Sequence, residues 1–147
     1  MQRPDDGLTG GDARTLAFAS YRIDAGLLDR LLRYQRALVE ALGDRSSPEE
    51  IASAHRLALA TAGLSQAVVE RALAVVRRFA GNREVAGRLR DSAAAIPPER
   101  AAGVQERLAA LDRELRARDD AGTMAVLLQH EGELLALHRR FLRLGAA

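Results

Sequence analysis

Glu131 and His138 have the side-chain chemistry to build a site inside this protein. A helix turns about 100° per residue, so both fall near the middle of the apolar face that begins at Leu127. A carboxylate is rarely placed in the centre of a packing face unless it is paired with a cation or bound to a ligand. The sequence therefore indicates one candidate site in the last predicted helix, without indicating a reaction.

Five polar residues are predicted to project from the centres of apolar helix faces: Gln35, His55, Asn82, Glu131 and His138. Inward carboxylates and imidazoles are the usual metal ligands of helical bundles. Glu131 and His138 lie seven residues apart, or about 10.5 Å along the axis, and no Glu-x-x-His pair is present. A metal or haem site would therefore need a further ligand, for which His55 is the candidate.

The other interpretation of these residues is structural, and we favour it. Glu131 would pair with an arginine from another helix or lie partly exposed at an interface, and His138 would bond a carbonyl group or a neighbouring side chain. Asn82 would fix the register of two helices, as a buried polar residue does in coiled coils. His130 falls at the edge of the apolar stripe and is interpreted as a boundary residue. No cofactor is expected, although a histidine in the core is also a candidate pH sensor.

The composition restricts the chemistry. No cysteine and no lysine occur among the 147 residues. Disulfides, thiolate metal sites, cysteine nucleophiles and Schiff-base chemistry are thereby excluded. No glycine-rich phosphate loop or nucleophile elbow is present, and Ser47 and Ser65 are explained as helix caps. We therefore expect a protein that is not an enzyme.

Arginines supply all 22 basic charges, but the net charge is only +2. One group lies on the longest predicted helix: Arg77, Arg78, Arg83, Arg88 and Arg90. Such a stripe is a candidate nucleic-acid surface, which we retain as an alternative function. Aromatic residues are missing from it, however, and Glu84 and Asp91 dilute its charge, so we do not expect nucleic acid as the partner.

The fold class is predicted to be all-α, an antiparallel bundle of four to five helices. The chain is 48% hydrophobic but only 3% aromatic, so the core must consist mainly of leucine, valine and alanine, which suit closely packed helices. Capping and breaking residues separate five predicted helices, at 25–42, 48–62, about 66–95, 98–116 and about 121–144. The third continues through Gly81-Asn82, because apolar spacing of three and four persists there.

The ends of the sequence carry weaker signals. Residues 1–12 are polar and glycine-rich and are predicted to form a disordered tail, whereas residues 13–147 should form one domain. Residues 13–23 fit either a short helix or an arm lying over the bundle. No secretory leader or membrane span is recognised, so a cytoplasmic location is the default expectation.

The third predicted helix carries apolar side chains beyond its central seam, at Val69, Leu73 and Val76. This arc is wide enough for two neighbours, and one of these could be a second chain. We therefore expect a non-enzymatic interaction or regulatory module that binds itself, as a homodimer, or another helical protein. The alternative from another class is a bundle that binds a metal or small ligand through Glu131, His138 and His55.

Overall fold

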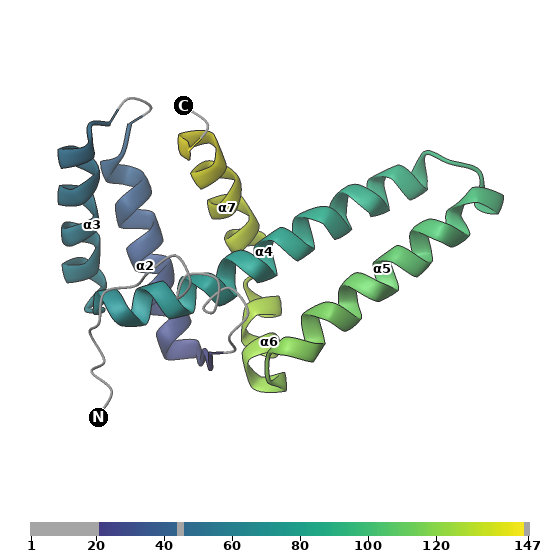
Figure 1. Cartoon of the computed structure of the whole chain (residues 1–147), viewed down its shortest axis with the longest axis horizontal. Coiled ribbons are helices and arrows are strands. Elements are labelled where there is room, and N and C mark those ends of the chain that lie inside the picture. Colours follow the sequence, from purple (N-terminus) through teal and green to yellow (C-terminus); the bar gives the residue numbers. More distant parts are fainter. Residues whose placement is uncertain (1–20, 44–45, 146–147) are drawn as a thin grey trace, which may run out of the picture.

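The computed structural model describes residues 21–43 and 46–145, which contain six α-helices and no strand (Figure 1). The helices are α2 (Ala25–Ala41), α3 (Pro48–Ala62), α4 (Gln66–Ala94), α5 (Pro98–Arg118), α6 (Ala121–Gln129) and α7 (Glu131–Gly145). The predicted all-α class is confirmed. So is the single long helix, since the 29 residues of α4 run unbroken through Gly81 and Asn82.

Most of these helices begin at a residue whose side chain caps the first turn, as the capping rules predict. Asp24 accepts from the backbone of Leu27 at the start of α2, at 2.7 Å. Ser47 and Glu50 form a reciprocal capping box at the start of α3. At the end of α3, Gly63 adopts a left-handed conformation with φ of 67°, which a residue with a side chain rarely adopts.

The body of the molecule consists of α2, α3, α6, α7 and residues 66–80 of α4. In Figure 1, α2 and α3 stand side by side, α4 crosses beside them, and α7 rises from its middle. The side chains of Leu28, Phe79 and Leu127 are completely buried here, and Leu134 is 1% exposed. The core therefore joins α2, α4, α6 and α7.

The arm consists of residues 81–94 of α4 together with α5, and it extends away from the body as a two-helix hairpin (Figure 1). Pro97 and Pro98 form the connection, as predicted, because neither residue can continue the preceding helix. Only Leu111 and Leu115 are buried among the 21 residues of α5. The arm is therefore a thin layer, in which α5 packs on α4.

The prediction of a single helix at about 121–144 is wrong, because the chain forms two helices there, α6 and α7. The break falls at His130, whose backbone has φ of −111° and ψ of 17°. The Nδ1 atom of its ring lies 3.0 Å from the Val126 carbonyl oxygen. The side chain thus lies at the carbonyl that would accept from the His130 backbone in a continuous helix, and the His130 backbone donates instead to the Leu127 carbonyl. Periodicity alone did not reveal the break, since leucines continue on both sides of it.

No single helix in the described ranges is long and apolar enough to cross a membrane. Only α3 and α4 taken together reach that length and composition, and they are bent by 93° at their junction. The predicted tail at 1–12, and most of the ambiguous segment at 13–23, lie outside the described residues. At the edge of that segment, Ile23 is 2% exposed and belongs to the core.

Candidate functional site

Glu131 and His138 lie at the edge of the packing face of α7, and both are only half-buried. Leu134 and Leu137 occupy the most buried positions of α7, at 1% and 7% exposed, while Leu142 is 55% exposed. The packing face of α7 follows Leu134 and Leu137, and at about 100° per residue Glu131 and His138 fall to one side of it. The two candidate residues therefore border the core instead of occupying its centre.

Glu131 is bound by an arginine from another helix, as the structural interpretation predicts. The Nε atom of Arg83, on α4, donates to Oε1 of Glu131. The two side chains are 12% and 30% exposed, so the pair is partly shielded from water. The carboxylate thus has a cationic partner at the point where the arm leaves the body.

His138 borders a small cavity between α2, α4 and α7, together with Tyr34, Gln35 and Arg77. The cavity holds about 50 Å³, enough for a few water-sized atoms and far too little for haem. Gln35 is 5% exposed, and its Oε1 atom is buried without a hydrogen-bond partner. Among the described residues, no hydrogen bond joins His138 to a carbonyl group or to a neighbouring side chain, the two partners predicted for it. This cavity is a polar defect in an otherwise apolar core.

His55 is held by a neighbouring phenol. The Tyr34 hydroxyl lies 2.8 Å from Nδ1 of His55, and the two rings pack edge to face with centroids 5.7 Å apart. Tyr34 is 3% exposed, and its burial raises the pKa of the phenol above the usual value, despite an opposing effect from Arg77. One nitrogen of His55 is therefore already engaged between α2 and α3.

Asn82 joins the two helices at the base of the arm. Its Nδ2 atom donates to the Leu111 carbonyl at 2.8 Å, while its buried Oδ1 atom has no partner. A buried amide that accepts or donates at one position disfavours sliding of one helix along the other. Asn82 thus lies at the contact between α4 and α5, where it was predicted to lie.

The five candidate residues do not form one cluster. Gln35 and His138 share the cavity, His55 is joined to Tyr34, and Asn82 and Glu131 make contacts at the base of the arm. Within residues 21–43 and 46–145, no three histidine, aspartate or glutamate side chains gather closely enough to hold a metal ion. The arrangement of these residues suits packing and helix positioning.

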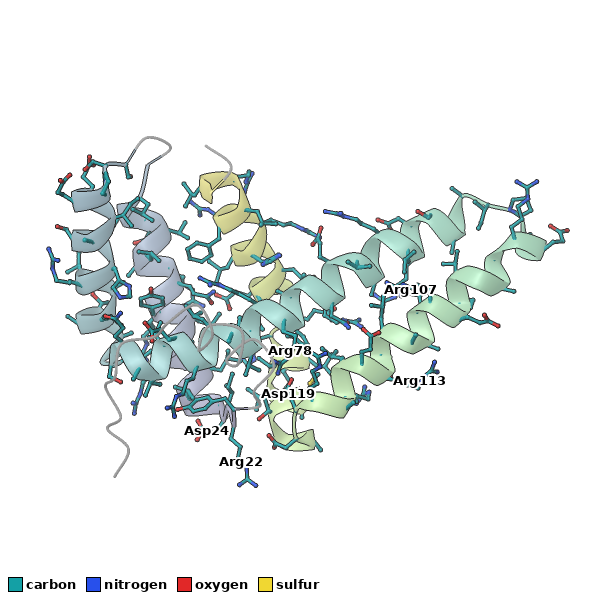
Figure 2. The ribbon with its side chains drawn as sticks, in the orientation of Figure 1. Arg22, Asp24, Arg78, Arg107, Arg113 and Asp119 are labelled. Carbon is teal, nitrogen blue, oxygen red and sulfur yellow. The ribbon has the colours of Figure 1, made fainter. Side chains whose placement is uncertain are left out.

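Sequence reasoning missed the most deeply buried ion pair. Asp119 is 1% exposed at its side chain and accepts from Nη2 of Arg78 at 2.7 Å (Figure 2). The Arg78 side chain is 15% exposed. An acidic doublet at this place in the chain is expected to interact favourably with the start of the following helix. That expectation holds for Asp120, which caps α6, but Asp119 turns inward to the junction of α4 and α5.

A second polar contact fixes the chain before α2. Thr123 is 1% exposed, and its hydroxyl accepts from the Ile23 backbone at 3.0 Å while donating to Asp120 at 2.6 Å. The side-chain hydrogen bond from Thr123 is the main cause that lowers the pKa of Asp120. The sequence offered a weak signal in the Asp-x-x-Thr spacing, but the distant backbone partner required the tertiary structure.

The arginine stripe on α4 is partly neutralised. Arg78 pairs with Asp119 and Arg83 with Glu131, while Arg88 lies 3.8 Å from Glu84. Arg77 and Arg90 remain exposed. Ion pairing of this kind leaves fewer cations for phosphate groups.

Comparison of the chain with protein-family models, curated proteins and solved structures gives no match.

Proposed function

We propose that this protein is a non-enzymatic interaction module that associates with itself through its arm. The incomplete burial of α5 is the single observation that carries the proposal. Two residues are buried among its 21, whereas six are buried among the 17 residues of α2. Along α4, Ala86 is the only buried residue after Ala80. The outer side of α5 is thus available to a partner.

The chemistry of the candidate residues supports a non-enzymatic role. Glu131 is bound to Arg83, His55 to Tyr34, and Asn82 to the Leu111 carbonyl. A metal site built from Glu131, His138 and His55 would have to break two of these contacts. The nucleic-acid alternative is weakened in the same way, because Arg78 and Arg83 already bind carboxylates.

Sedimentation velocity over a wide range of protein concentration tests the proposal. We expect the apparent mass to rise from that of one chain, 15.9 kDa, toward twice that value. A mass that stays at one chain up to about 1 mM would overturn self-association, since weaker contacts carry less than about 4 kcal/mol. Metal analysis of the same sample tests the alternative, because stoichiometric metal would favour the ligand-binding function.

A further inference from the structure

A shallow open groove runs along α5, from the flank where Arg107 projects toward α4 round to the side that faces away from α4 (Figure 2). Its volume is about 600 Å³, and its lining consists of Gly103, Glu106, Arg107, Ala109, Ala110 and Arg113. The opposite side of the helix carries Leu111 and Leu115, which are buried in the arm. In Figure 2, Arg113 projects from the side of α5 turned away from α4. The outward face of α5 has small side chains in the middle and charged side chains beside them. It consists of Ala102, Glu106, Ala109, Ala110, Arg113 and Ala117.

The charges on the outward face have no partners within the described chain. Glu106 and Arg113 enter none of its ion pairs, although Asp112 and Arg116 on the same helix lie 3.1 Å apart. Glu106 and Arg113 are seven residues apart, too far to pair with each other along a helix. A partner that supplies the opposite charges at the same spacing would therefore be complementary to this face.

The order of residues along the face has a centre of symmetry between Ala109 and Ala110. Glu106 and Arg113 lie at equal distances on either side of this centre, as do Ala102 and Ala117. Spacings of three and four residues keep all of these positions on one side of the helix. Glu106 thus has its chemical complement, Arg113, at the mirrored position of the same helix, and the alanines at 102, 109, 110 and 117 mirror one another.

We infer that this face docks on the same face of a second copy, with the two α5 helices antiparallel. The two-fold axis passes between Ala109 and Ala110. Glu106 of each copy then faces Arg113 of the other, which gives two equivalent ion pairs. A parallel arrangement would instead place Glu106 against Glu106. The alanines have small side chains, so the helix axes can approach to about 8 Å. This inference rests on the proposed self-association and specifies its surface.

The contact is small, so the dimer is weak. The stretch from Ala102 to Ala117 spans about 22 Å of helix. One helix pair of this length buries less than the roughly 1,200 Å² found in stable complexes. The dimer should accordingly form at micromolar or higher concentrations, and salt should weaken it, because its ion pairs lie near water.

Charge reversal tests the pairing. We expect E106R alone and R113E alone to weaken the dimer about tenfold or more, because each places like charges opposite one another. The double variant E106R/R113E should restore it. An equimolar mixture of the two single variants should form a heterodimer, since one chain then presents two arginines and the other two glutamates. The matched control is R100E, which makes the same charge change as R113E on α5 but outside the face.

A cysteine cross-link tests the axis, since the native chain has no cysteine. Ala110→Cys should give a disulfide-linked dimer under mild oxidation, and Gln105→Cys, on the flank of α5, should not. If the wild-type chain stays monomeric, the proposed self-association and this interface both fail. If it self-associates but E106R and R113E leave the affinity unchanged, or Ala110→Cys gives no cross-linked dimer, the interface is wrong while self-association stands.

Discussion

The body and the arm use similar residues but bury them to different extents. Residues 66–80 of α4 lie among α2, α6 and α7, and Val75, Phe79 and Ala80 are completely buried there. Beyond that point the same helix keeps its apolar spacing with Leu89, which stays half-buried because α5 is the neighbouring helix there. Burial therefore depends on how many elements surround a helix, and the amphipathic pattern of α4 alone does not fix it.

The largest expected effect comes from comparing one substitution in the body with one in the arm. Phe79→Ala should lower the free energy of unfolding by about 3–5 kcal/mol, because a completely buried ring leaves a cavity. Leu108→Ala in the arm should cost about 1 kcal/mol, since this side chain is only half-buried. Urea unfolding followed by circular dichroism measures both. Equal losses would show that a partner covers the arm in solution.

The ion pair at the junction of body and arm should have the next largest effect. Asp119→Ala leaves Arg78 without its carboxylate in a shielded position, so we expect a loss of about 3 kcal/mol. The matched control is Asp112→Ala, which breaks an exposed pair with Arg116 and should cost less than about 0.5 kcal/mol. Thermal unfolding compares the two variants. A small loss for Asp119→Ala would mean that the pair contributes little beyond its own desolvation.

Asn82 tests how firmly the arm is held to its own two helices. Asn82→Ala removes the donor to the Leu111 carbonyl and should lower stability by about 1–2 kcal/mol. Hydrogen exchange should rise in α5 more than in α2, because α5 has few other buried contacts. Ser92→Ala, exposed near the end of α4, is the control. Uniform exchange changes in both helices would show that the arm unfolds together with the body.

The smallest predicted effect depends on pH. The pKa of Asp120 is lowered in the folded protein, mainly by its hydrogen bond from Thr123. The resulting stabilisation is fully present above the unfolded pKa of 3.8 and is lost as pH falls through the lower folded value. Asp120→Asn keeps a capping side chain that does not titrate. Between pH 5 and pH 2 the wild type should therefore lose more stability than this variant. Urea unfolding of both proteins at each pH measures this loss. An equal loss of unfolding free energy in the two proteins would contradict the prediction.

The elements of the fold were accessible from the sequence because their signals are local. Ser47 with Glu50 and the Pro97-Pro98 pair mark helix boundaries through bonds and clashes within a few residues. The break at His130 could not be predicted from the sequence. Its side chain contacts the Val126 carbonyl, and the apolar spacing of the helix continues unchanged on both sides. The packing face of α7 was also predicted around the wrong centre, since it follows Leu134 and Leu137 and leaves Glu131 and His138 at its edge.

The sequence by itself determined the all-α class, the long α4 helix and most helix ends, because helix formation responds to neighbours three and four residues away. Only the tertiary structure decided which charges are buried and which helix faces remain uncovered. Asp119 and Asp120 are adjacent and identical, yet one meets Arg78 in the interior and the other caps α6 at the surface. Such differences arise from residues distant in the chain, whose positions follow from packing and not from periodicity.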